Sequence, residues 1–384
     1  MVNTAPEYDI LIATRTAPTY TGGLANYQLT LATALLHAMP GCRIGFLVFE
    51  AAQLGQLPVR DLPPHTYVLS EHFREPRGLW MRLASRPWLH GILEYLIRRT
   101  FRPGKLADQM IPRAKVIHYV GTGWDFFGFA MCQWARHTGA RFTIWPALHP
   151  GTWGDDRIDL RLYQLADIVF CQSNYEIEHL ASLGLPRNRT IYSILPPMCR
   201  TTGDGNRFRE RFDLGGRKLV LFVGRRDAEK GYFTICEIWP HIVSHHPDAV
   251  LVLAGPGAPQ TERLTNAICD LGIPDDETLA DAFAAADVFC LPSANESFGL
   301  VYAEAWSYGK PVICGTAPAS RELVQESGGG IVSDQSNGAL AEALLSLLAD
   351  ENLRVQLGRS GHKFQQNMLN QEKFVEIHRK AFAI

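Results

Sequence analysis

The feature that most constrains the fold is a short apolar run followed by a loop, a helical segment and a second apolar run. Residues 288–291 (VFCL) have the length and composition of a buried parallel strand, and residues 292–313 read PSANESFGLVYAEAWSYGKPVI. Gly309-Lys310-Pro311 ends the helical segment and precedes the next strand. In such a unit the loop leaves the carboxyl end of a strand and the helix begins with unpaired backbone N–H groups, which favours an anionic ligand there.

Two acidic residues flank the predicted helix start. Glu296 lies in the loop and Glu304 follows roughly two helical turns later, about 12 Å away if the chain is helical throughout. Ser297, Phe298 and Gly299 would supply backbone N–H donors. Only a long ligand could contact both acids, and a nucleotide-sugar qualifies, because carboxylates bind its ribose and sugar hydroxyls while its diphosphate suits a helix N-terminus. The alternative is that Glu304 is a solvated helix residue and Glu296 an ordinary loop acid.

At these residues the chain resembles the retaining GT-B glycosyltransferases of family 4 (glycosyl transferases group 1), whose hallmark is a pair of glutamates separated by seven residues. Glu296 and Glu304 match that pair, with Ser-Phe-Gly after the first acid and Gly-Lys-Pro-Val downstream. The resemblance implies an α/β protein of GT-B architecture, with two doubly wound Rossmann-like domains facing each other across a cleft. It also implies a donor site on the second domain and an acceptor site on the first.

A second motif places two cations near the end of another predicted strand. Residues 218–224 (KLVLFVG) form the strand, Arg225 follows Gly224, and Lys230 precedes the next helix. Two such cations can neutralise a diphosphate and stabilise it as a leaving group without a metal ion. The string VGRRDAEKG resembles the family's Gly-Arg and Glu-Lys-Gly elements, so Arg225 and Lys230 are assigned to the donor site and Arg226 is not. The alternative is that both are solvated loop charges.

The first half of the chain has two weaker candidates. Gly22 and Gly23 follow the predicted strand 8–15, where glycine permits close approach to a ligand, although a plain tight turn also explains them. The family commonly has Gly-Gly in this loop. His149 follows the predicted strand 141–148, where it could contact a sugar hydroxyl or shuttle a proton, or else belong to the core. The family also places a histidine here. His118 lies within a strand and is expected in the core.

The predicted domains follow from two series of alternating strands and helices. Residues 1–200 form an acceptor-binding Rossmann-like domain, 201–217 a linker rich in Gly, Thr and Arg, and 218–362 a nucleotide-sugar-binding Rossmann-like domain. Residues 363–384 are expected to form the helix that, in GT-B folds, crosses back to the first domain.

Residues 73–115 carry ten basic and three acidic residues, interleaved with apolar residues at roughly helical spacing. Such a stretch could bind an anionic membrane surface through Arg82, Arg86, Arg98, Arg99 and Arg102, with Trp80 and Trp88 entering the interface. It could equally be a helical pair that packs its apolar side on the domain, or a nucleic-acid surface. No nucleic-acid motif accompanies the charge, so no nucleic-acid partner is predicted.

The remaining composition favours a cytoplasmic protein, with contact to the inner leaflet left open. No run of about 18 apolar residues occurs, the N-terminus lacks the pattern of a secretion signal, and the eight cysteines are scattered singly, as reduced core thiols would be.

The predicted activity is retaining, metal-independent transfer of a hexose from a nucleotide-sugar to a glycan or lipid-linked acceptor, in cell-surface polysaccharide or glycolipid synthesis. A nucleotide-sugar epimerase or phosphorylase on the same fold and a non-catalytic nucleotide-sugar-binding protein are the alternatives. No DxD carboxylate pair is present to hold a metal, and no cofactor is expected, since the nucleotide-sugar is a co-substrate. Whether Glu296 is a nucleophile, an electrostatic stabiliser or a sugar ligand stays open.

The predicted catalytic residues are His149, Arg225, Lys230 and Glu296. The predicted donor-binding residues are Gly22, Gly23, Gly224, Arg225, Lys230, Glu296, Ser297, Phe298, Gly299, Leu300, Val301 and Glu304.

Overall fold

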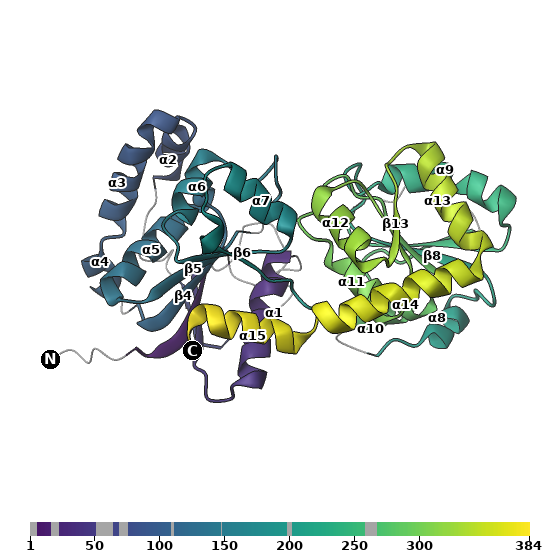
Figure 1. The fold of residues 1–384 in the computed structure, drawn as a ribbon, viewed down its shortest axis with the longest axis horizontal. Coiled ribbons are helices and arrows are strands. Elements are labelled where there is room, and N and C mark those ends of the chain that lie inside the picture. Colours follow the sequence, from purple (N-terminus) through teal and green to yellow (C-terminus); the bar gives the residue numbers. More distant parts are fainter. Residues whose placement is uncertain are drawn as a thin grey trace. The chain divides into compact units, whose positions relative to one another are not determined.

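The computed structural model describes residues 6–16, 23–50, 64–68, 76–108, 111–146, 148–197, 202–257 and 267–384. The chain divides into two compact units (Figure 1). The first comprises Met1–Leu195 together with Gln371–Ile384, and the second comprises Pro196–Asn370.

The first unit contains a parallel sheet whose described strands run in the order β3-β2-β1-β4-β5-β6-β7. The strands are β1 (Tyr8–Thr16), β2 (Ile44–Glu50), β3 (Thr66–Val68), β4 (Ala114–Val120), β5 (Arg141–Trp145), β6 (Ile168–Cys171) and β7 (Thr190–Tyr192). The chain reverses its direction of winding between β1 and β4. In open α/β sheets, ligands bind beyond the carboxyl ends of the strands at such a switch point.

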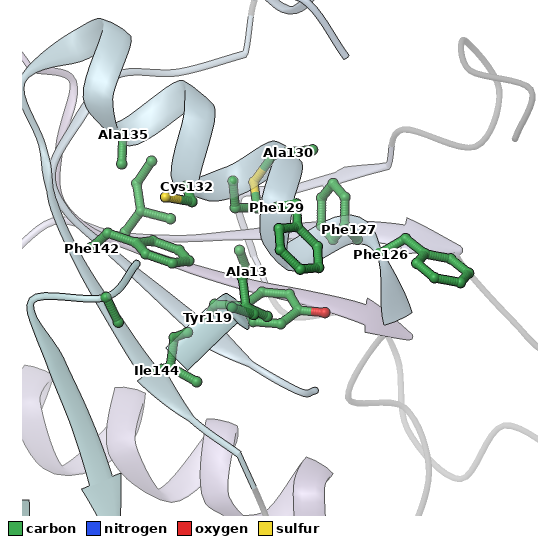
Figure 2. Packing of buried hydrophobic residues seen from close by; sticks show 14 of the residues in the cluster. Ala13, Tyr119, Phe126, Phe127, Phe129, Ala130, Cys132, Ala135, Phe142 and Ile144 are labelled. Carbon is green, nitrogen blue, oxygen red and sulfur yellow. The ribbon is translucent and has the colours of Figure 1, made fainter. Parts of the chain in front are cut away.

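Helices cover this sheet, and the most deeply buried is α5. The helices are α1 (Gly23–Ala38), α2 (Arg77–Ala84), η1 (Pro87–Leu89), α3 (His90–Thr100), α4 (Pro103–Asp108), η2 (Gly123–Asp125), α5 (Phe127–Thr138), α6 (Arg157–Tyr163), α7 (Asn174–Ser182), η3 (Arg187–Arg189) and α15 (Gln371–Phe382). Figure 2 shows α5 lying over the sheet, with Phe127 and Phe129 on the same side of the helix as Tyr119 of β4, whose ring centre lies 6.2 Å from that of Phe127. A helix that is apolar on most sides packs as a core element.

The second unit contains a smaller parallel sheet with the described order β10-β9-β8-β11-β12-β13. The strands are β8 (Lys218–Val223), β9 (Ala249–Ala254), β10 (Ile268–Asp270), β11 (Val288–Leu291), β12 (Val312–Cys314) and β13 (Gly330–Val332). The helices are α8 (Gly205–Arg211), α9 (Tyr232–His245), α10 (Asp276–Ala285), α11 (Leu300–Ser307), α12 (Pro318–Ser327), α13 (Asn337–Ala349) and α14 (Glu351–Met368). Here the switch point lies between β8 and β11.

The prediction that residues 201–217 form a linker is wrong. Helix α8 occupies the middle of this stretch, and the Asp204 side chain caps it by accepting from the backbone N–H groups of residues 206 and 207. Arg207 donates twice to Asp281 of α10, at 2.6 and 2.8 Å, and Phe208 is buried. The segment therefore packs as part of the second unit, and its Gly- and Arg-rich composition serves close packing and ion pairing.

The predicted start of the final helical segment at residue 363 also differs from the structure. Helix α14 continues to Met368 within the second unit, and the chain rejoins the first unit at Gln371. There α15 packs against α1.

A buried hydrogen-bond network attaches α15 to the first sheet. The Tyr27 hydroxyl lies 2.9 Å from Nε2 of His118 and 3.0 Å from Nε2 of His378, and none of the three side chains is more than 1% exposed. Nδ1 of His378 donates to the Phe374 carbonyl at 2.9 Å, and Nδ1 of His118 lies 2.8 Å from the Thr143 hydroxyl. The expectation that His118 is a core residue is confirmed.

The network has one consistent arrangement of protons when both imidazoles are neutral. Because Nδ1 of His378 donates to a carbonyl, its Nε2 accepts from the Tyr27 hydroxyl, which in turn accepts from Nε2 of His118. The Thr143 hydroxyl then donates to Nδ1 of His118. Burial lowers the pKa of both histidines and brings that of His378 to about 4, in keeping with neutral rings.

We expect the stability of the first unit to depend on pH through His378. Its pKa is lower in the folded state, about 4 against 6.5, so the unfolded chain binds more protons between these values and stability falls as the pH drops from 6.5 to 4. The loss should be about 1.4 kcal/mol per pH unit. Chemical denaturation at several pH values should therefore show the wild type losing stability relative to His378→Gln, which keeps polar groups but does not titrate. A wild-type-to-variant difference that is constant with pH would contradict this prediction.

Candidate functional site

Two of the sequence motifs meet at the switch point of the second sheet. Strands β8 and β11 are paired neighbours, with Val220 opposite Val288 and Leu221 opposite Phe289. Because the strands are parallel, the loop that carries Arg225 and Lys230 and the loop that carries Glu296 leave the sheet at the same edge. The sequence placed each motif at the carboxyl end of a strand, and the strand order makes those two ends adjacent.

An ion pair joins the two loops. Nζ of Lys230 lies 2.5 Å from Oε1 of Glu296, and the side chains are 14% and 12% exposed. The same ammonium group donates to the Asn295 carbonyl at 3.1 Å, while the Lys230 backbone N–H donates to Asp227 at 2.9 Å. The structure thus brings together the cation predicted to contact a diphosphate and the acid predicted to contact a sugar.

Backbone contacts hold the same two loops together. The Glu229 carbonyl accepts from the Ala294 N–H at 2.7 Å and from the Ser293 hydroxyl at 3.3 Å. Gln335 extends the connection, since its side-chain amide donates to the Glu229 carbonyl at 3.0 Å and to the Pro292 carbonyl at 2.6 Å. The sequence does not reveal the role of Gln335, because residue 335 is far along the chain from residues 229 and 292. Only the folded structure places its side chain beside their carbonyl groups.

The two arginines after β8 have different environments. Arg225 is 58% exposed and forms ion pairs with Asp227 at 2.9 Å and Glu229 at 3.0 Å. The Arg226 side chain is only 2% exposed, contacts both carboxylate oxygens of Asp270 and donates to the Gly255 carbonyl. Its hydrogen bonds to Asp270 raise the pKa of Arg226. Arg226 is therefore a structural residue, whereas the exposed Arg225 can reach a ligand.

Glycines rather than capping side chains precede the helices at this site. Gly231 before α9 and Gly299 before α11 are both left-handed, with φ of 73° and 81°, and neither helix has a side-chain cap. By contrast, Asp275, Ser336 and Asp350 accept hydrogen bonds from the first turns of α10, α13 and α14. The first backbone N–H groups of α9 and α11 are therefore left without a side-chain acceptor, as an anion site requires.

Helix α11 begins later than the predicted donors. Ser297, Phe298 and Gly299 precede it, and the first turn starts with Leu300 and Val301. A Cβ on Gly299 would lie 2.3 Å from the Tyr302 ring, whose hydroxyl donates to the carbonyl of Leu291 at 2.6 Å. Phe298 is buried, so its backbone is anchored beside the helix start.

Glu304 lies within α11 and is half-buried. The estimate of two helical turns between Glu296 and Glu304 is wrong, because the left-handed Gly299 interrupts the helix and leaves Glu296 in a loop. From Leu300 to Glu304 the helix rises only about 6 Å.

The predicted site residues of the first unit are Gly22, Gly23 and His149. Gly22 lies outside the described residues, and Gly23 is the first residue of α1. Strand β5 ends at Trp145, before Pro146, rather than at residue 148 as predicted, because proline has no N–H to continue the ladder. His149 is half-buried in a turn, where its backbone pairs with Trp153 in both directions at 2.9 Å.

Within the described residues, no group of three or more His, Cys, Asp or Glu side chains has a geometry that could hold a metal ion.

The sequence and structure resemble known glycosyltransferases. Residues 205–364 match the family model described as glycosyl transferases group 1. The GDP-mannose-dependent alpha-(1-6)-phosphatidylinositol monomannoside mannosyltransferase of Mycobacterium tuberculosis is 29% identical over 300 residues, which cover 68% of this chain and 75% of the relative. The phosphatidyl-myo-inositol mannosyltransferase of Mycobacterium leprae is 35% identical over 145 residues, 36% of this chain and 39% of the relative.

Among solved structures, sucrose-phosphate synthase from Thermosynechococcus elongatus superimposes with a TM-score of 0.72 at 21% identity, covering 98% of this chain and 99% of that one. This likeness concerns the fold. The predicted fold class, α/β with the two doubly wound domains of GT-B proteins, is confirmed.

We expect Gly231→Ala to destabilise the second unit. The new Cβ would lie 2.6 Å from Pro292 Cγ, in addition to the strain of a left-handed alanine, and overpacking of this kind costs about 1 to 3 kcal/mol. Gly215→Ala is the matched control, since Gly215 also has positive φ but a Cβ there would meet no atom within 4 Å. Thermal unfolding of both variants measures the difference. Equal destabilisation would show that Pro292 does not constrain the loop after β8.

Proposed function

We propose that the chain transfers a hexose from a nucleotide-sugar to a lipid-linked acceptor, with retention of anomeric configuration and without a metal ion, because residues 205–364 match the glycosyl transferases group 1 model and the similar proteins are mannosyltransferases. The observation that carries the proposal is the Lys230–Glu296 pair at the β8/β11 switch point, beside two helix N-termini that lack side-chain caps. GDP-mannose is the proposed donor, because the relative that matches over the greater length is GDP-mannose-dependent.

The proposed roles follow from the charges at the site. Arg225 is exposed, and its carboxylate partners Asp227 and Glu229 are also in contact with solvent, so a diphosphate can replace them at little desolvation cost. Lys230 and the N-terminus of α11 add positive charge where negative charge grows on the departing phosphate. These groups would do the work that a metal ion does in other transferases.

The acids and the first-unit residues complete the proposal. Glu304 on α11 accepts hydrogen bonds from the ribose hydroxyls, and Glu296 accepts from the transferred sugar while Lys230 balances its charge. We propose His149 as a contact to a sugar hydroxyl or a proton shuttle, with Gly22 and Gly23 allowing close approach of the sugar.

We also propose that the first unit contacts an anionic membrane through the face of α2, η1 and α3. Its exposed apolar residues are Leu79, Met81, Trp88, Ile92 and Tyr95, with exposures from 41% to 78%. Arg82, Arg86 and Arg102 are exposed nearby, and no acidic partner is found for them in the part of the chain that the structure describes. Arg99 donates to the Tyr95 hydroxyl at 3.3 Å, and Arg98 lies 3.9 Å from Glu94.

One part of the membrane prediction is wrong. Trp80 is fully buried and packs on Phe101 and Phe126, so it belongs to the core and cannot enter a membrane interface. No helix among the described residues is long and apolar enough to cross a bilayer. Trp88, 78% exposed, is left as the interfacial tryptophan of this face.

Incubation with a panel of nucleotide-sugars tests the proposed function. We expect GDP-mannose to be turned over with slow release of GDP in the absence of acceptor, at the same rate in EDTA as in Mg²⁺, and an acceptor lipid to receive the sugar with unchanged anomeric configuration. Recovery of an epimerised donor would identify an epimerase. Binding of the nucleotide-sugar without any turnover would identify a binding protein.

We expect Glu304→Gln to weaken GDP binding. The substitution removes the charge from a hydrogen bond to the ribose, and loss of a charge-assisted hydrogen bond costs about 1.5 to 3 kcal/mol, or roughly a tenfold to hundredfold rise in Kd. Titration calorimetry measures the change. Glu342→Gln is the control, because Glu342 is exposed on α13 and makes the same change of charge. Unchanged affinity in Glu304→Gln would remove the ribose contact from the proposal.

We expect Arg225→Gln to lower kcat more than it raises KM. Arg225 would act on phosphate charge that increases towards the transition state, so its loss should cost about 2 to 4 kcal/mol in the activation free energy. Arg359→Gln, an exposed substitution on α14, should leave both constants at wild-type values. Steady-state kinetics in which Arg225→Gln raised KM alone would show that Arg225 binds the ground state and does not assist departure of the diphosphate.

A further inference from the structure

A groove in the first unit lies outside every residue assigned to glycosyl transfer. It has a volume of about 590 Å³ and lies between η1 with the start of α3 on one side and α6 on the other. Its lining residues are Pro87, Trp88, His90, Arg157, Leu160, Arg161 and Gln164. All of them belong to a single unit, so the groove is formed by that unit alone.

The charge of the groove is positive. Arg157 is exposed and makes no hydrogen bond or ion pair with the described part of the chain. Nε of Arg161 pairs with Oε1 of Glu94, an acid that also lies 3.9 Å from Arg98, so one carboxylate is shared between two guanidinium groups. A guanidinium fork without an acidic partner is suited to a phosphate.

A buried histidine faces the same space. His90 is 3% exposed and its Nε2 donates to the Ala84 carbonyl at 2.8 Å, which fixes the ring. Its other nitrogen, Nδ1, has no hydrogen-bond partner among the described residues, and the residue lines the groove. Nδ1 is not among the buried unpaired atoms, so solvent reaches it and a ligand in the groove can take the place of that solvent. Because Nε2 donates to a carbonyl, Nδ1 can accept a hydrogen bond from a P–OH group of a ligand.

The rim of the groove is apolar on one side. Trp88 lines it and is 78% exposed, and Ile92 and Tyr95 follow on α3 at 53% and 59% exposure. Figure 1 shows α3 beside α2 in this unit. A free phosphate ester would leave these side chains in water, whereas a lipid surface would accept Trp88 at headgroup depth and the phosphate beside it.

We propose that this groove binds the phosphate of an anionic membrane lipid, with Arg157 and Arg161 contacting the phosphate oxygens, His90 completing the site and Trp88 entering the interface. The proposal rests on the proposed membrane contact and deepens it, because it replaces general attraction to negative charge with a defined headgroup site. Arg86 is the internal reference: it is exposed on the same face, adjacent to Pro87, but does not line the groove.

Co-sedimentation of the full-length protein with vesicles tests the site. The vesicles contain phosphatidylcholine with phosphatidic acid or, at equal surface charge, with oleate, which is anionic but carries no phosphate of its own. Arg157→Gln should lower affinity for the phosphatidic acid vesicles by clearly more than fivefold and affinity for the oleate vesicles by about fivefold, the factor that one basic residue contributes at an anionic surface. Arg86→Gln should lower both by about fivefold.

Equal effects of Arg157→Gln and Arg86→Gln on both kinds of vesicle would overturn the headgroup site and leave only general electrostatic attraction. A second arm uses glycerol 1-phosphate in solution: competition at concentrations that match the lipid phosphate would identify a site for soluble phosphate esters and overturn the lipid assignment.

Donor hydrolysis measured without vesicles distinguishes a failure of the headgroup site from a failure of the proposed function. Arg157→Gln should release GDP from GDP-mannose at the wild-type rate, since Arg157 is not part of the proposed transfer site. If the wild type turned over no donor, the proposed function would fail while the vesicle result would stand. If donor turnover were normal and Arg157→Gln bound phosphatidic acid like the wild type, only the headgroup site would fail.

Discussion

The ion pair between Lys230 and Glu296 is the interaction on which the candidate site depends. Both side chains are nearly buried, so removing one partner would leave an unpaired charge in a poorly solvated place, at a cost of about 3 to 5 kcal/mol. The pair also ties the loop after β8 to the loop after β11, and the two helices that follow those loops are thereby held with their N-termini near one edge of the sheet. The ion pair therefore fixes both the charges at the site and the relative positions of the two loops.

Backbone conformation at the same edge serves both folding and binding. Gly231 and Gly299 occupy left-handed positions that a side chain would strain, and each is packed against a neighbour that leaves no room for a Cβ. A serine or aspartate before these helices would have capped them, as Asp275 caps α10, and would have occupied the N–H groups that an anion needs. The site thus gives up helix-capping stability in exchange for anion-binding capacity, whereas α8, α10, α13 and α14 of the same unit keep side-chain caps.

The first unit divides its aromatic and basic residues between a core and a surface. Trp80 and Trp88 are close in sequence, but helical periodicity turns Trp80 towards Phe101 and Phe126 while Trp88 follows a proline and projects into solvent. A packed helical pair and a membrane-binding surface were alternative interpretations of this stretch of ten basic residues. The buried Trp80 supports the packed pair, and the exposed face with Trp88 is the one for which we propose membrane contact.

The sequence by itself determined the fold class, the two strand-and-helix series and the positions of Arg225, Lys230 and Glu296 at strand ends, because apolar runs and turn residues are local signals. Tertiary structure alone decided that Lys230 pairs with Glu296, that Gln335 joins their loops and that residues 204–211 pack on α10 rather than linking the units. It also decided that Trp80 is buried and Trp88 is exposed. The physical reason is that strand order and side-chain burial depend on contacts between residues far apart in the chain, and no local pattern encodes those distances.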